Sequence, residues 1–213
     1  MAAYQVPAQR TRVELRFRNS RFIGTADRAD TVQVARQFIA QVRDEFPDAS
    51  HHVYAFAVGH GASVTHGMSD DGEPSGTAGR PVLAVVQGSR LGDVAVVVTR
   101  YFGGTKLGTG GLVKAYTATA QEVLAVTPRH EKVGHVAFLA EMTYDAYAVC
   151  RRLLAEHGAQ EVREAFGERV QVRARVRRDA FGDLAAALQA ATAGRLTLHP
   201  DGAGVESPPA GPR

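Results

Sequence analysis

Three carboxylates lie close together in a loop segment that is rich in glycine, serine and proline. The segment runs from Ser69 to Pro81, and Asp70, Asp71 and Glu73 fall within four positions of one another. Oxygen ligands of this kind suit a hard cation such as magnesium. The same carboxylates could instead cap backbone amides or pair with arginines such as Arg80 and Arg100. The sequence leaves these two alternatives open, although the spacing excludes a calcium-binding loop.

A second loop, Gly103 to Gly111, joins an apolar segment to the start of a long helix. Unshielded amides at a helix N-terminus attract anions, and glycines let a phosphate approach the backbone. Charge for such a guest could come from Arg100, Lys106 and Lys114. Tyr101 or Phe102 could stack on a base. The glycines could equally permit close helix–strand packing and positive φ angles. Neither of the common glycine-rich nucleotide motifs is present, so both alternatives stand.

Together the two loops supply eleven candidate binding residues. They are Asp70, Asp71, Glu73, Thr77, Arg80, Arg100, Tyr101, Lys106, Thr109, Lys114 and Tyr116. The sequence contains no Gly-x-Ser-x-Gly motif and no helical pair of histidines at zinc-protease spacing. We therefore assign no catalytic residue. Hydrolysis enters only as an alternative, in which the three carboxylates would support a magnesium-assisted phosphohydrolase or peptidase.

A row of arginines alternates with apolar residues further along the chain. Arg173, Arg175 and Arg177 are separated by Ala174 and Val176. A strand places alternate side chains on opposite faces, so the apolar residues would face a core and the arginines would form one row. A positive row on an open sheet face suits the phosphates of RNA, whereas base-specific reading would need stacking aromatics. A solvated sheet face is the alternative.

The elements that position these residues follow from the spacing of apolar side chains. Strands are expected over Thr11–Phe17, Arg21–Ala26, His52–Gly59, Ser63–Met68 and Asp93–Thr99, and helices over Val32–Phe46, Leu83–Gln87 and Leu112–Val126. Pro81 could lie in the first turn of the helix that carries Leu83–Gln87. The almost uniform Val and Ala content of Asp93–Thr99 predicts a strand that is buried on both faces. Both loops would then flank this strand.

Beyond residue 131 the pattern changes to that of a small α+β domain. Strands are expected over Val133–Met142, Ala159–Ala165, Arg169–Arg177 and Arg195–His199, and helices over Asp145–His157 and Asp179–Ala193. This β-α-β-β-α-β order is the ferredoxin-like arrangement. We expect a first domain over residues 1–127, a boundary at Thr127–Glu131, a second domain over 132–200 and a disordered tail over 201–213.

Composition limits the remaining function classes. The 213 residues carry a net charge of +3, which permits a polyanionic partner without requiring one. Cys150 is the single cysteine, so a disulfide and a cysteine zinc site are excluded, and a buried thiol is expected. No signal-peptide run and no 18-residue apolar stretch occur, which predicts a cytosolic protein without a membrane partner. Oligomeric state is not indicated by the sequence.

Several segments taken together resemble the YigZ/IMPACT family over about residues 10 to 126. They are Ser20-Arg21-Phe22-Ile23, the corner from Pro47 to His52, the acidic loop from Asp70 to Gly79, Val98 to Gly104, and Leu107 to Tyr116. The region from about Val133 to His199 resembles, less specifically, the extra C-terminal domain of bacterial members. The combination of segments is highly specific to this family.

The resemblance implies a first domain like domain 2 of ribosomal protein S5 and a second like the C-terminal ferredoxin-like module of elongation factor G. Eukaryotic IMPACT proteins regulate translation initiation, but through a route that involves an additional protein-binding domain not found in this sequence. The leading expectation is a translation-associated, non-catalytic factor that binds RNA or the ribosome, with the two loops forming one cleft. A regulator that acts through protein contacts alone is a further alternative.

Overall fold

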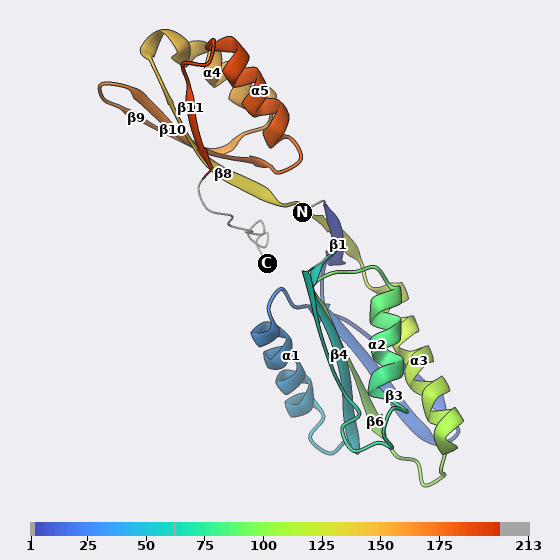
Figure 1. The fold of residues 1–213 in the computed structure, drawn as a ribbon. Coiled ribbons are helices and arrows are strands. Elements are labelled where there is room, and N and C mark those ends of the chain that lie inside the picture. Colours follow the sequence, from blue (N-terminus) through green and yellow to red (C-terminus); the bar gives the residue numbers. More distant parts are fainter. Residues whose placement is uncertain (1–2, 62, 201–213) are drawn as a thin grey trace. The chain divides into compact units, whose positions relative to one another are not determined.

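The computed structural model describes residues 3–61 and 63–200 (Figure 1). They form two units, a first over Tyr4–Glu131 and a second that begins at Lys132 and also includes Ala3. The predicted disordered tail, 201–213, lies outside the described residues. Among the described helices, none combines the length and the apolar character that crossing a bilayer requires. Each unit has its own apolar core and is described separately below.

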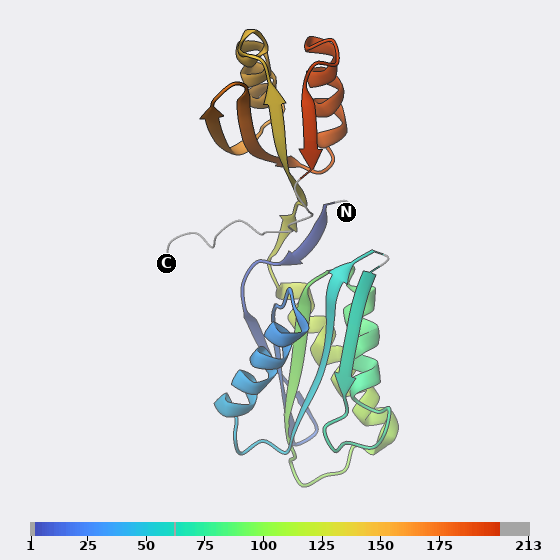
Figure 2. The same ribbon diagram turned by 60° about the vertical axis from the view of Figure 1, so that its left-hand side comes forward.

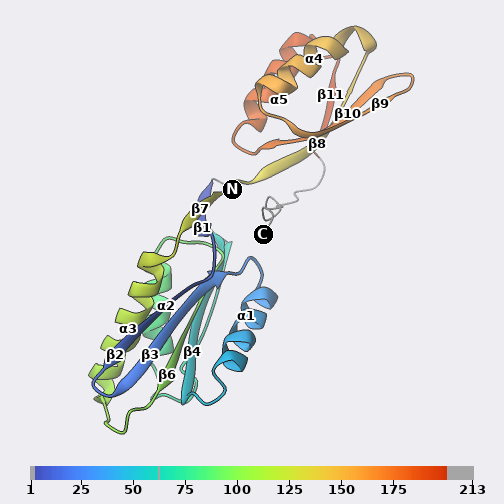
Figure 3. The same ribbon diagram turned by 180° about the vertical axis from the view of Figure 1, so that it is seen from behind.

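A five-stranded antiparallel sheet forms the centre of the first unit. Its strands are β2 (Thr11–Phe17), β3 (Ser20–Arg28), β4 (His51–His60), β5 (Ser63–Ser69) and β6 (Val94–Tyr101). Their spatial order is β2-β3-β6-β4-β5, and Figure 3 shows β2, β3, β6 and β4 side by side. All neighbouring strands are antiparallel, and β6 lies in the middle. The acidic loop therefore leaves an edge strand, whereas the glycine loop leaves the central one.

Helices cover both faces of this sheet, α1 (Val32–Glu45) on one side and α2 (Gly79–Gly88) with α3 (Gly108–Val126) on the other (Figure 2). Strand β6 contributes Val96 and Val98 to the core beneath α2 and α3, and Val97 to the core beneath α1. The central strand is thus buried on both faces, as its Val and Ala content predicts. Thr31 caps α1 by accepting a 3.1 Å hydrogen bond from the Val34 amide.

Two helices are longer than the sequence indicates. α3 begins at Gly108 rather than Leu112, because Gly108, Gly110 and Gly111 belong to its first turn. α2 begins at Gly79 and ends at Gly88. Pro81 lies in its first turn, as predicted, where no backbone N–H is needed. The glycine loop is therefore shorter than expected, and its glycines are mostly helical.

A second difference concerns the chain's start and the end of the first unit. β1 (Tyr4–Pro7) pairs with β7 (Arg129–Lys132) in a two-stranded sheet. The Tyr4 hydroxyl donates a 2.7 Å hydrogen bond to buried Asp93, and its ring stacks on His60. The segment Thr127–Glu131, predicted as a boundary, therefore contributes most of a strand. Arg129–Lys132 contains no apolar residue, so hydrophobic alternation gives no signal for this strand.

The second unit has the predicted β-α-β-β-α-β order. Its elements are β8 (His135–Met142), α4 (Tyr144–Glu156), β9 (Gln160–Phe166), β10 (Val170–Arg177), α5 (Phe181–Ala191) and β11 (Thr197–Pro200). The sheet is antiparallel with order β11-β8-β10-β9, and α4 and α5 lie on one face (Figure 1). Cys150 is buried in this core, and burial raises the pKa of its thiol. It packs as a small hydrophobe, as expected.

Candidate functional site

Asp70 holds the acidic loop against the start of α2. Its carboxylate accepts hydrogen bonds from the amides of Gly76, Ala78 and Gly79 at 2.9, 3.1 and 2.7 Å. Burial acts to raise the pKa of Asp70, but the backbone hydrogen bonds outweigh it and the pKa lies below the ordinary carboxyl value. Both carboxylate oxygens are therefore engaged by the chain's own amides.

Asp71 joins the same loop to β4 and α1. Its carboxylate accepts a 2.6 Å hydrogen bond from the His52 amide and is paired with Arg43. The Asp71 carbonyl also lies 2.8 Å from Nδ1 of His51. Burial lowers the pKa of the neighbouring His52 ring, which favours a neutral imidazole. These contacts fix the loop and leave Asp71 in a structural role.

Glu73 forms a buried ion pair with Arg100 of β6. Arg100 Nη1 lies 2.5 Å from Glu73 Oε1, and the side chains are 6% and 3% exposed. The Tyr116 hydroxyl of α3 donates a 2.7 Å hydrogen bond to the same oxygen. Burial, and then the Glu73 carboxylate, raise the pKa of Tyr116, so its hydroxyl stays protonated and remains a donor. Glu73 thus links the acidic loop to the central strand and to α3.

The three carboxylates do not converge on a common point, because each is bonded to a different part of the fold. Within residues 3–61 and 63–200, no group of three His, Cys, Asp or Glu side chains is placed to hold a metal ion. Capping and pairing with Arg100, one of the two alternatives from the sequence, is the arrangement in the structure. The loop therefore offers no ready magnesium site on Asp70, Asp71 and Glu73.

The two loops meet, but at a buried contact rather than an open cleft. Glu73, Arg100 and Tyr116 seal their junction, and Thr77 is also buried and donates to the Pro74 carbonyl at 2.7 Å. Four residues predicted to contact a ligand are thus occupied within the protein. The sequence shows that the loops carry charge but not that these side chains point inward.

The remaining candidates of the first unit lie at the surface. Arg80, Lys106, Thr109 and Lys114 are exposed, and the first turn of α3 has no side-chain cap. Tyr101 is half-buried, and its hydroxyl donates a 2.8 Å hydrogen bond to Asp48. A binding role for these residues stays a prediction, and it now rests on the exposed cations rather than on Arg100.

Strand β10 has the predicted alternation in the second unit. Its apolar residues Val170, Val172, Ala174 and Val176 are buried, and the residues between them lie on the opposite face. Arg175 Nη1 lies 3.0 Å from Glu161, and Arg177 Nη2 lies 2.8 Å from Asp179. Arg173, by contrast, makes no ion pair with any described residue. The three arginines are therefore not equivalent.

Arg173 faces a residue that the sequence analysis missed. In the register of β9 and β10, Arg163 is directly opposite Arg173, and it too has no ion-pair partner among residues 3–61 and 63–200. On the other side, Arg173 faces the half-buried Leu139 of β8. Counting back from the Gly167 turn would have identified Arg163, because Phe166 pairs with Val170. Two unpaired like charges thus lie side by side on the helix-free face of this sheet.

Taken together, these features define a two-unit α+β protein with an internally bonded acidic loop and an arginine-bearing sheet face. The chain belongs to the IMPACT family. Residues 18–124 match the Impact N-terminal domain, and residues 141–195 match a domain of unknown function, DUF1949.

Relatives and a solved structure support this assignment. The chain is 34% identical to an IMPACT family member of Haemophilus influenzae over 200 residues, which cover 93% of this chain and 97% of the relative. It is 39% identical to IMPACT family member YigZ of Escherichia coli over 157 residues, or 73% and 77% of the two chains. A crystal structure described as that of an hypothetical protein matches with a TM-score of 0.69 and 34% identity, and covers 93% of this chain and 97% of the other. The YigZ-like assignment from the sequence is thus confirmed.

Proposed function

We propose that this protein is a translation-associated factor that binds RNA of the ribosome, without catalysis, through the helix-free face of its second unit. The observation that supports this most directly is the pair Arg163–Arg173. Like charges placed opposite each other on neighbouring strands destabilise a sheet. Neither guanidinium has an ion-pair partner among residues 3–61 and 63–200. A row of phosphates would supply the missing negative charge.

The surroundings of this pair also suit a sugar–phosphate backbone. Arg175 and Arg177 extend the row along β10 and are held by Glu161 and Asp179 at its border. Leu139, half-buried on β8, offers an apolar surface beside Arg173. Apart from the His135 ring, which is opposite Arg177, this face of β8 and β10 carries no aromatic side chain, and the lack of Phe, Tyr and Trp favours contacts to phosphate and sugar over base-specific reading.

The first unit supports the same function in a secondary way. Lys106 and Lys114 are exposed around the uncapped start of α3, where backbone amides favour negative charge. The acidic loop, which would have to carry hydrolytic chemistry, has its carboxylates engaged by Arg100, Tyr116 and backbone amides. A binding factor therefore fits the geometry better than a magnesium-assisted hydrolase. The match of residues 18–124 to the Impact N-terminal domain supports the link to translation, because the resemblance to this family implies such a role.

The test is a salt titration of RNA binding by the double variant Arg163→Ala/Arg173→Ala. We expect weaker binding to a labelled RNA hairpin, and the slope of log K against log salt should fall by about two units, one for each lost phosphate contact. Binding of purified ribosomes, followed by sedimentation, should weaken in parallel.

The matched control is Arg152→Ala. This arginine lies on α4, on the helical side of the same unit, with a side chain that is 69% exposed and paired with Glu156. It removes one charge without touching the proposed face, so binding should stay close to that of the unmodified protein. Equal salt slopes for the double variant and the unmodified protein would reject the proposed RNA face.

A further inference from the structure

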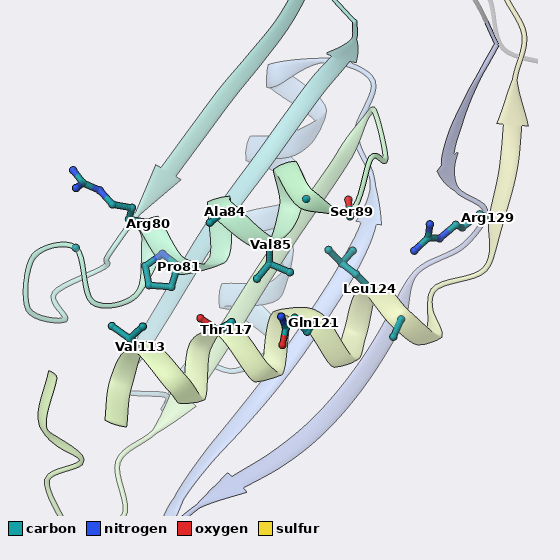
Figure 4. A pocket seen from close by; sticks show the side chains of 13 residues that line it. Arg80, Pro81, Ala84, Val85, Ser89, Val113, Thr117, Gln121, Leu124 and Arg129 are labelled. Atoms are coloured by element: carbon teal, nitrogen blue, oxygen red, sulfur yellow. The ribbon is translucent and has the colours of Figure 1, made fainter. Parts of the chain in front are cut away.

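A groove of about 770 Å³ runs between α2 and α3, on the side of these helices away from the sheet (Figure 4). Val82 and Val86 of α2 face the sheet and are fully buried, whereas Ala84 and Val85 line the groove. The outer surface of a helix pair is ordinarily polar. Here it carries apolar side chains, and a hollow lined in this way can receive apolar side chains of a partner.

The groove is free of charge along most of its length. On α3 its wall consists of Val113, Thr117, Gln121 and Ala125, which follow one another at four-residue spacing and so lie on one helix face. On α2 the only charged residue is Arg80. Val113 is 39% exposed although it is aliphatic. This continuous uncharged surface is long enough for about three turns of a helix, since α2 itself has ten residues.

Both ends of the groove are positive. Arg80 lies beside Pro81 at one end, with its side chain directed away from α3, and Arg129 lies beyond Leu124 at the other (Figure 4). The residues that line the groove include no aspartate or glutamate. An occupant therefore needs an apolar middle and negative charge at both ends.

We infer that this groove binds an amphipathic helix of a partner protein, with apolar residues at four-residue spacing between acidic residues at its two ends. Small side chains at Ala84, Gly88 and Ala125 allow the backbone of such a helix to approach closely. A helix laid in an apolar groove is a common mode of peptide recognition. This contact is independent of the RNA face proposed above, because it lies entirely in the first unit.

A second copy of this chain is a poorer occupant. A two-fold contact places the same surface on both copies. In either direction along the groove, Arg80 or Arg129 of one copy would then face an arginine of the other. Like charges at the rim of an interface disfavour that pairing.

The experiment is a selection from a displayed library of 14-residue helical peptides against the full-length protein, followed by affinity measurements on the best synthetic peptide. We expect enriched peptides with an apolar row between acidic ends. Ala84→Glu, at an exposed position of the groove, should weaken binding by about tenfold or more, through bulk and repulsion. Gln37→Glu, which adds the same charge at an exposed position of α1, should leave the affinity for the peptide unchanged.

Charge reversal provides the sharper arm. The double variant Arg80→Glu/Arg129→Glu should lose the acid-ended peptide and prefer its counterpart with lysine at both ends. The inference is overturned if no peptide is enriched, if binding is insensitive to Ala84→Glu, or if charge reversal leaves the preference unchanged. Sedimentation velocity tests the alternative occupant. If the protein self-associates and Ala84→Glu abolishes the self-association, the groove binds a second copy of the chain and the inference is wrong.

Discussion

The acidic loop of the first unit and the arginine face of the second unit are both dense in charge, yet the fold uses them in opposite ways. Glu73 and Arg100 are turned inward and neutralise each other, with Tyr116 as an additional donor. Arg163 and Arg173 are turned outward and face each other without a counter-charge among the described residues. Paired, buried charge maintains the architecture, whereas unpaired, exposed charge is available to a partner.

The difference originates in local backbone geometry. In the acidic loop a short side chain such as that of Asp70 can turn towards the backbone amides at the start of the next helix. These amides donate hydrogen bonds to the carboxylate and satisfy its charge. In strand β10 the period of two forces every second residue away from the core, whatever its charge. The loop can therefore satisfy its own charges, and the strand cannot.

The largest expected effect concerns the buried charges of the first unit. Replacing Glu73 with alanine should lower the free energy of unfolding of the first unit by about 3–5 kcal/mol, because the buried Arg100 guanidinium loses its partner. Urea unfolding followed by tyrosine fluorescence measures the change. Glu122→Ala, at an exposed position of α3, is the control and should change stability by no more than about 0.5 kcal/mol.

A double variant distinguishes the unpaired charge from a simple loss of packing. If the cost of Glu73→Ala comes from the isolated guanidinium, Glu73→Leu/Arg100→Met should be less destabilising than Glu73→Ala alone. A double variant that is as unstable as the single one, or more so, would contradict this explanation of the pair.

An intermediate effect is expected at Asp70. Asp70→Asn removes the charge that accepts three amide hydrogen bonds at the start of α2 and should cost about 1–2 kcal/mol at neutral pH. Because the folded pKa of Asp70 lies below its ordinary value of 3.8, this stabilisation is complete above that pH and is lost as the pH falls further. The difference between the two proteins should therefore shrink in urea titrations carried from pH 6 towards pH 3. A constant difference would argue against the carboxylate as its source.

The sequence predicted correctly those features that a repeating pattern of apolar residues determines. It did not predict which side chains of the two loop regions point into the protein. The β-α-β-β-α-β order, the buried central strand β6 and the outward row on β10 all follow from repeating patterns. Residue spacing could not show that Glu73 and Thr77 turn inward, because a loop has no fixed period. Arg100 and Tyr116 differ, because they lie on β6 and α3. Arg100 continues the alternation of Val96 and Val98, and Tyr116 lies at helical spacing from Leu112 and Ala120, so periodicity would have predicted their inward direction. Helical glycines at the start of α3 were missed for a related reason, since glycine permits a loop and a helix alike.

The smallest expected effect tests the outward half and has the opposite sign. Removing one member of a like-charged cross-strand pair relieves repulsion, so Arg163→Gln should stabilise the second unit by about 0.2–0.5 kcal/mol at low ionic strength. The gain should disappear in high salt, because screening already weakens the repulsion. Thermal unfolding of both proteins at two salt concentrations measures it, with Arg152→Gln as the control on α4. A loss of stability would mean that Arg163 has a structural role like that of Arg100, and the contrast between the two regions would then fail. A gain of stability together with weaker RNA binding would mean that the repulsion between Arg163 and Arg173 is kept because both residues bind the ligand.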